Sequence, residues 1–176
     1  MFMTKPTKLP HDLDTNDFTC RAVIETPKGS RSKFDCDPDS GLFLLAGLVP
    51  AGMSFPLSFG FIPSTRAEDG DPLDVMVLHE EAIPVGSLVS VRLLGIIEGD
   101  QTEHGKTVRN DRILAVSTCS HEYEQIKDVE QLGDKFLDHL TQFWVNYNAL
   151  KGKRFEVRGM HGAEQASYAV KKASKH

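Results

Sequence analysis

The sequence predicts an α+β fold, in which a small β-barrel carries helices packed on its outside. Two observations lead to this prediction. Short segments rich in β-branched and apolar residues, each bounded by turn residues, fill most of the chain up to residue 116. One apolar stripe at three- and four-residue spacing then runs from Leu132 to Tyr147. The length of 176 residues, 40% of them apolar and 26% charged, is typical of one compact domain.

Seven segments are predicted to be strands, at residues 18–25, 32–36, 42–45, 73–79, 87–97, 112–116 and 154–157. We expect the second to pair with the first, and 112–116 to return antiparallel to 87–97 across a loop that contains Gly99 and Gly105. Residues 50–63 mix Pro, Gly and Phe, which indicates irregular chain.

The apolar stripe predicts a helix over residues 132–147, which Gly152 is placed to end. We interpret its apolar face as core packing. A shorter helix is expected over residues 163–174. The first residues are polar and carry several Pro and Asp residues, so the predicted organisation is an N-terminal arm at 1–17 and one domain at 18–176.

Composition argues against several classes of function. A total of 20 Lys and Arg against 25 Asp and Glu gives a net charge of -5, which does not favour nucleic acid as a partner. The longest apolar run, at 42–49, is far shorter than the ~20 residues that cross a bilayer. Three widely spaced cysteines suit buried free thiols in a reducing compartment. We therefore expect a cytoplasmic protein with no membrane or nucleic-acid partner.

The acidic residues are concentrated in one segment. Residues 68–91 contain six acids and neither Lys nor Arg. Asp69, Asp71 and Asp74 lie within six residues, and carboxylates this close repel one another unless cations lie among them. Oxygen ligands favour Mg²⁺, followed by Ca²⁺ or Mn²⁺. On spacing alone, a metal site and a solvated acidic turn are equally good interpretations.

Residues 68–75, Glu-Asp-Gly-Asp-Pro-Leu-Asp-Val, resemble the signature of the family I soluble inorganic pyrophosphatases. The likeness extends over residues 22–168 and includes Val23-Ile24-Glu25-Thr26-Pro27, Phe59-Gly60-Phe61-Ile62 and Lys151-Gly152-Lys153. The resemblance implies an OB-like closed barrel, a homo-oligomer in the cytoplasm, and Mg²⁺ as the cofactor, with Mn²⁺ as a substitute. It also implies a reaction, in which a metal-held water hydrolyses diphosphate to two phosphates.

The same resemblance implies roles for individual residues. Asp71 matches the carboxylate that takes a proton from the attacking water. The residues expected to hold phosphate are Lys33, Arg112 and Tyr147. The residues expected at the metal ions are Asp69, Asp71, Asp74, Asp100, Glu25, Asp35 and Asn110.

Several positions depart from the family pattern around the substrate. Gly47 and Asn148 stand where the family has an arginine and a lysine, and Phe55 and Phe59 stand where it has tyrosines. Two lost charged contacts could weaken transition-state binding by about 3–6 kcal/mol if they added, which is on the order of a hundred- to ten-thousand-fold. Other arginines could compensate; the candidates are Arg31, Arg66 and Arg109.

Two departures concern the strand at 112–116. Arg112 replaces a lysine, which keeps the charge but not the compact ammonium. Asn110 stands at a metal-ligand position. A one-residue slip would supply Asp111 instead, but it would turn every side chain of the strand over.

Three hypotheses therefore remain. The chain is a diphosphate hydrolase, or a hydrolase of another phosphoanhydride that stacks on Phe55 and Phe59, or a non-catalytic relative that binds metal or phosphate.

Overall fold

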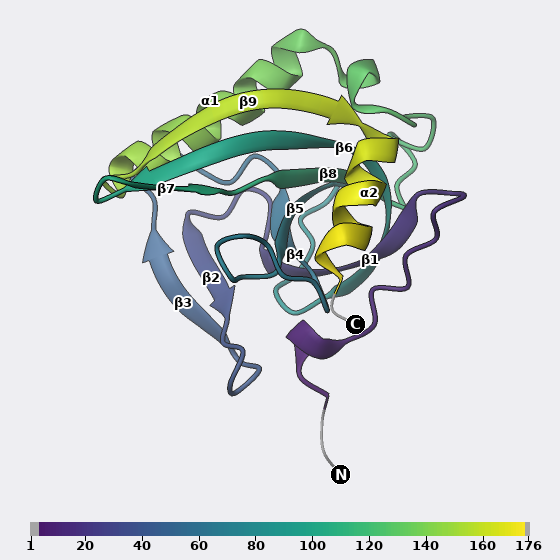
Figure 1. Cartoon of the computed structure of the whole chain (residues 1–176), viewed down its shortest axis with the longest axis horizontal. Coiled ribbons are helices and arrows are strands. Elements are labelled where there is room, and N and C mark those ends of the chain that lie inside the picture. The colour runs from purple at the N-terminus through teal and green to yellow at the C-terminus, as the bar shows by residue number, and fades with distance from the viewer. Residues whose placement is uncertain (1–3, 175–176) are drawn as a thin grey trace.

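The computed structural model of the chain describes residues 4–174 and consists mostly of β-sheet with two helices (Figure 1). The strands are β1 Thr19–Thr26, β2 Ser32–Cys36, β3 Phe43–Leu48, β4 Ser58–Ile62, β5 Leu73–Leu78, β6 Leu88–Glu103, β7 Lys106–Arg109, β8 Arg112–Ser117 and β9 Arg154–Gly162. The helices are α1 Asp134–Leu150 and α2 Ala163–Ala173, with short 3-10 turns η1 Pro6–Lys8 and η2 Val129–Leu132. The predicted α+β class agrees with this content.

Seven strands form one sheet in the order β1-β4-β5-β8-β6-β7, and β9 also pairs with β6. Strand β1 pairs antiparallel with both β4 and β6. Strands β5 and β8 are parallel, whereas β8 returns antiparallel to β6 as the sequence predicts. The parallel pair is important for the site, because it places Asp74 directly opposite Arg112.

Strands β2 and β3 form a separate hairpin, which projects from the main sheet in Figure 1. The prediction that residues 32–36 pair with 18–25 is therefore wrong. After β1 the chain turns away, because Gly29 N–H donates to the carbonyl of Phe55 at 2.8 Å and Phe55 N–H donates to that of Ser30 at 3.0 Å.

Two strands lie where the sequence predicts irregular chain or a loop. Strand β4, within residues 50–63, is buried along its whole length and so lacks the polar and apolar alternation that marks a half-buried strand. Strand β7 is a short polar partner of β6 beyond a tight turn, in which His104 and Gly105 both have positive φ. Strands β6 and β9 also extend further than the predicted segments.

The core has two parts, on the two sides of the strands. One packs the predicted stripe of α1, including Leu140, Phe143 and Trp144, against Met76 and Leu114. Figure 1 shows α1 running alongside β9. The other part is built from β1, β5, β6 and β8 and is covered by α2. The interpretation of the stripe as core is thus confirmed.

Residues 4–17 are hydrogen-bonded to the rest of the chain. Ser64 N–H donates to the carbonyl of Thr7 at 2.9 Å, and the His11 ring lies 2.9 Å from the Ser174 hydroxyl. The other three residues of the predicted arm lie outside the described range. Within residues 4–174, no helix is both long and apolar enough to cross a membrane.

The cysteines differ in exposure. Cys20 is buried, and burial raises the pKa of its thiol to about 12. Cys36 is partly buried and Cys119 is exposed. The expectation of buried thiols is therefore correct for Cys20 only.

Gly60 in β4 allows an unusually close approach of β1. A Cβ at this position would lie 1.8 Å from the carbonyl oxygen of Val23, whereas a Cβ at Gly47 in β3 would meet no atom within 4 Å. We expect Gly60→Ala to lower the free energy of unfolding by about 3 kcal/mol, because two backbones must move apart. Gly47→Ala is the matched control and should change it by less than about 0.5 kcal/mol. Urea denaturation measures both, and equal effects would contradict this packing.

Candidate active site

A cavity of about 340 Å³ collects all but one of the residues that the sequence predicts for the site. These are Glu25, Lys33, Asp35, Asp69, Asp71, Asp74, Asn110, Arg112 and Tyr147. They come from β1, β2, β5 and its preceding turn, β8 and α1, so that segments far apart in the chain meet here. Lys33 and Asp35 are two residues apart on β2, which directs both side chains to one face.

Arg112 and Asp74 form the central contact of the cavity. The Arg112 Nη1 donates to Asp74 Oδ2 at 2.8 Å and to Asn110 Oδ1 at 2.9 Å, and the Arg112 side chain is only 4% exposed. Asn110 in turn donates through Nδ2 to Gln101 Oε1 at 3.0 Å. Burial raises the pKa of Asp74 to about 6, although the Arg112 charge opposes that rise. One guanidinium therefore joins a carboxylate to a chain of two neutral amides.

The guanidinium is also packed between aromatic rings. Its Cζ lies 4.0 Å from the centre of the Trp144 ring and 5.1 Å from that of Phe155. Trp144 belongs to α1, so the helix that covers the sheet also holds this cation. Arginine stacks on aromatic faces in this way more readily than lysine does.

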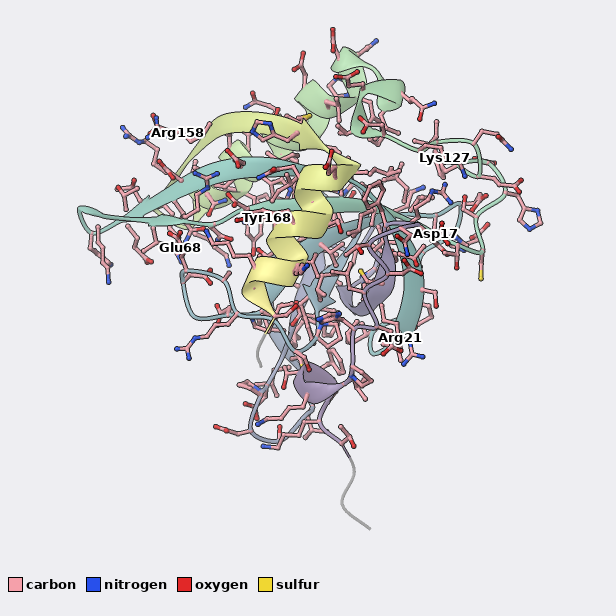
Figure 2. The ribbon with its side chains drawn as sticks, turned by 45° about the vertical axis from the view of Figure 1, so that its right-hand side comes forward. Asp17, Arg21, Glu68, Lys127, Arg158 and Tyr168 are labelled. Carbon is pink, nitrogen blue, oxygen red and sulfur yellow. The ribbon has the colours of Figure 1, made fainter. Side chains whose placement is uncertain are left out.

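Asp100 is the predicted site residue that the structure does not bring to the cavity. Its Oδ2 accepts a hydrogen bond from Arg158 Nε at 2.6 Å. Figure 2 shows Arg158 on β9 with its side chain pointing outward. Successive residues of a strand face opposite sides, so Gln101 lines the cavity in place of Asp100. A neutral amide thus lines the cavity at the place where the carboxylate of Asp100 is expected.

The same alternation separates Asn110 from Asp111. Asn110 lines the cavity. Asp111 accepts hydrogen bonds from Gly99 N–H at 3.1 Å and from the Arg109 guanidinium, away from the cavity. The register that places Asn110 at the site is the one the structure adopts.

The remaining acids differ in their surroundings. Asp69 accepts a hydrogen bond from the backbone of Asp71 at 3.1 Å, and no Lys, Arg or His among residues 4–174 pairs with either side chain. Glu25 is only 9% exposed and accepts from Cys36 N–H at 2.8 Å. Burial raises the pKa of Glu25 to about 7 from its ordinary value of 4.5.

This donor set fits a hard cation in its chemistry, because it consists of carboxylate oxygens at one cavity. In the described part of the chain, no three His, Cys, Asp or Glu side chains converge as a ready metal cage. Asp74 is turned to Arg112, and Asp35 is paired with Lys33. Mg²⁺ commonly takes one or two carboxylates together with waters and substrate phosphates, and Asp69 and Asp71 offer such a pair.

Two lysines that the sequence analysis did not assign to the site also line the cavity. Lys151 Nζ lies 4.7 Å above the Tyr147 ring, and Lys153 Nζ lies 3.2 Å from Glu103 Oε2. Burial lowers the pKa of Lys151, with the nearby charge of Lys153 acting in the same direction. Their segment is part of the family resemblance, and that signal could have found them.

The arginines proposed to compensate for lost cations do not line this cavity. Arg31 donates to the carbonyl of Val49 at 3.0 Å. Arg109 is paired with Glu98 at 2.7 Å and with Asp111. Arg66 lines a different pocket, beside α2. Lys151 and Lys153 are better placed than any of the three.

The substituted positions have internal partners. Phe55 is 1% exposed and packs against Phe59, Phe143 and Tyr147, so its ring is not available to a ligand. Asn148 donates through Nδ2 to the carbonyl of Trp144 at 2.8 Å. Among the described atoms the buried Tyr147 hydroxyl has no hydrogen-bond partner, and Tyr147 is one of the residues that line the cavity.

Comparison with known proteins places this cavity in a family context. The family model described as inorganic pyrophosphatase matches residues 22–176. The chain belongs to the inorganic pyrophosphatase family. It is 34% identical to the soluble inorganic pyrophosphatase 2 of Chlamydomonas reinhardtii over 85% of this chain and 76% of that protein. It is also 34% identical to the inorganic pyrophosphatase of Aquifex pyrophilus, over 85% of this chain and 84% of that one.

Solved structures of inorganic pyrophosphatases share the whole fold. That of Thermus thermophilus superposes with a TM-score of 0.87 at 30% identity, covering 97% of both chains. That of Helicobacter pylori gives 0.84 at 28% identity, covering 94% of this chain and 96% of the other. The two structures therefore share the fold over nearly the whole of the matched chain.

The buried carboxyl of Glu25 predicts a pH-dependent stability. Because its pKa is raised in the folded state, folding binds a proton, and stability falls as pH rises from about 4.5 to about 7. We expect Glu25→Gln, in EDTA, to raise the free energy of unfolding at pH 8.5 by about 2–3 kcal/mol, and by much less at pH 5. Urea denaturation at both values tests this, and a gain that is independent of pH would contradict it.

Proposed function

We propose that this chain hydrolyses inorganic diphosphate to two phosphates with Mg²⁺ as its cofactor. Two proteins that are 34% identical to this chain carry the name inorganic pyrophosphatase. The observation that supports the proposal most is that one cavity is lined both by acids and by lysines. Asp69 and Asp71 have no paired cation among the described residues, and the lysines of the lining are Lys33, Lys151 and Lys153. Carboxylates recruit metal ions, and ammonium groups hold phosphate oxygens.

The proposed roles follow from these surroundings. Bound Mg²⁺, or Mn²⁺ in its place, would lower the pKa of a water and neutralise phosphate charge. Asp69 and Asp71 are the proposed direct ligands, with Glu25 near them. Asp71 is also the proposed acceptor of the proton that the attacking water loses.

Substrate binding is proposed to involve a set of donors on the same cavity. Lys33, Lys151 and Arg112 supply positive charge, and the Tyr147 hydroxyl supplies one uncharged donor. Asp35 is proposed to orient Lys33, and Asp74 to orient Arg112, since each is paired with that cation. In this arrangement Asp35, Asp74 and Asn110 act through their partners.

Further expectations go with the family. We propose that β1, β4, β5, β8 and β6 close into an OB-like barrel, because β1 pairs with both β4 and β6. A homo-oligomer, a cytoplasmic location, and the division into an arm at 1–17 and a domain at 18–176 stay predictions.

One alternative gains support from the structure and one loses it. Gln101, Asn110 and Asn148 are neutral at the cavity, which favours a non-catalytic relative that binds metal or phosphate. The other alternative, a larger phosphoanhydride that stacks on Phe55 and Phe59, loses the first of these rings, because Phe55 is enclosed by other aromatic rings, whereas Phe59 lines the cavity.

Phosphate release from diphosphate, and from nucleoside di- and triphosphates, separates these functions. With Mg²⁺ or Mn²⁺ we expect release from diphosphate, and Asp71→Asn should lower it by on the order of 10²–10⁴-fold, since it removes a general base. Asp138→Asn, on the exposed face of α1, is the matched control and should leave the rate unchanged. No release above the Asp71→Asn level on any substrate would reject the enzyme, and release from nucleotides alone would reject the diphosphate assignment.

Lys151 is expected to contribute to substrate binding. Lys151→Ala should raise KM for diphosphate by roughly ten- to a hundredfold, which is the range expected for one charged hydrogen bond. Lys135→Ala, at the exposed start of α1, is the control with the same charge change. Steady-state kinetics measures both, and an unchanged KM in Lys151→Ala would show that this amine does not contact phosphate.

A further inference from the structure

Arg112 lies where two side-chain oxygen atoms from different segments converge. Asp74 on β5 and Asn110 just before β8 both direct an oxygen to the same atom, Nη1 of Arg112, at 2.8 and 2.9 Å. In the described part of the chain Asp74 has no other charged partner within ion-pair distance. A carboxylate and an amide oxygen that converge on one point are the kind of ligands a hard cation takes. In this chain the cation at that point is the guanidinium of Arg112.

The guanidinium is held firmly in this position. The side chain is 4% exposed, and its charged group lies against the Trp144 ring at 4.0 Å and the Phe155 ring at 5.1 Å. Residues 74 and 112 are direct partners in the parallel β5–β8 pair, so the backbone fixes where the two side chains begin. Moving the guanidinium aside would expose it and remove its contacts with both rings.

The neighbouring residues suit a fixed monovalent cation. Asp74 supplies one negative charge to match the one positive charge of Arg112. Asn110 and Gln101 continue the network through a 3.0 Å hydrogen bond without adding charge. If residues 110 and 101 were carboxylates, they and Asp74 would together carry more negative charge than the one guanidinium of Arg112 could balance.

We propose that Arg112 takes the place of a metal ion, so that its guanidinium keeps a divalent cation out of the space between Asp74 and Asn110. This inference rests on the proposed metal-dependent function. It adds that the chain binds one divalent ion fewer than it would without the guanidinium, and that Asn110 and Gln101 serve Arg112 and not a metal.

The number of Mn²⁺ ions bound to metal-stripped protein tests the proposal. Isothermal titration calorimetry and the fall of the free Mn²⁺ electron paramagnetic resonance signal both count ions without relying on activity. Two changes are designed to open the position. Arg112→Gln removes the positive charge. Arg112→Lys combined with Asn110→Asp places two carboxylates, Asp74 and the new one at 110, around a smaller cation. The double variant keeps a positive charge at residue 112, so it provides a test in case the first variant does not fold.

Two controls match these variants. Arg158→Gln disrupts another Arg–Asp pair, with Asp100, outside the cavity. Asn146→Asp adds the same negative charge on the exposed face of α1. We expect each opened variant to bind one more Mn²⁺ than the natural chain. The added ion should bind at least about tenfold more tightly than any weak extra Mn²⁺ on the natural chain. Both controls should bind the same number of ions as the natural chain.

The outcomes separate this proposal from the proposed function. If the folded variants and the natural chain bind the same number of ions, the proposal is wrong, whether or not diphosphate is hydrolysed. If the opened variants bind one more ion than the natural chain, and the natural chain hydrolyses no substrate, the proposal stands and the enzymatic function fails. If no form binds Mn²⁺, both are wrong.

Discussion

The ion pair between Asp74 and Arg112 lies where β5, β8 and α1 meet at the cavity. It joins β5 to β8 across their parallel pairing, and it presents a flat cation to Trp144 of α1. Removing one partner of a buried ion pair typically costs about 3–5 kcal/mol, because the other charge stays buried and unpaired. The sheet, the covering helix and the polar cavity therefore all contribute to the surroundings of this one contact.

Electrostatics decides what can share the cavity with this pair. A divalent ion 4 Å from the guanidinium would be repelled by on the order of 8 kcal/mol at an effective dielectric constant of 20. That repulsion is comparable to the free energy of binding a ligand with a micromolar Kd. A metal ion can therefore bind beside Asp74 only if Arg112 is displaced, and otherwise it must bind at other carboxylates. Asp69 and Asp71 have no Lys, Arg or His paired with them among residues 4–174. Within the acidic segment, Asp74 is therefore already neutralised by Arg112, whereas Asp69 and Asp71 are available to a metal ion.

The sequence predicts the continuous parts of the site well and the parts built by strand register less well. Asp69, Asp71 and Asp74 lie in one short segment, so their spacing singles them out and the family resemblance assigns their roles. Choosing between Asp100 and Gln101 requires the direction of side chains on β6, and that alternation is interrupted where Leu94 is an extra residue against β8.

The fold shows the same division. The helix of the apolar stripe and most strands follow from periodicity, whereas β4 is buried on both faces and gives no alternation to detect. The pairing of β2 with β3 depends on contacts of the preceding turn with Phe55, which lies some 25 residues away in the chain. Lys151 and Lys153 reach the cavity because α1 ends beside it, and the spacing of charges alone does not reveal this.

The positions of the bound metal ions are the most direct test of whether Arg112 keeps a divalent ion away from Asp74. Crystals grown with Mn²⁺ and a non-hydrolysed diphosphate analogue would locate them by anomalous scattering at the manganese edge. We expect anomalous peaks beside Asp69 and Asp71, no peak between Asp74 and Asn110, and Arg112 still against Trp144. A peak between Asp74 and Asn110, with the guanidinium displaced from the ring, would contradict this expectation.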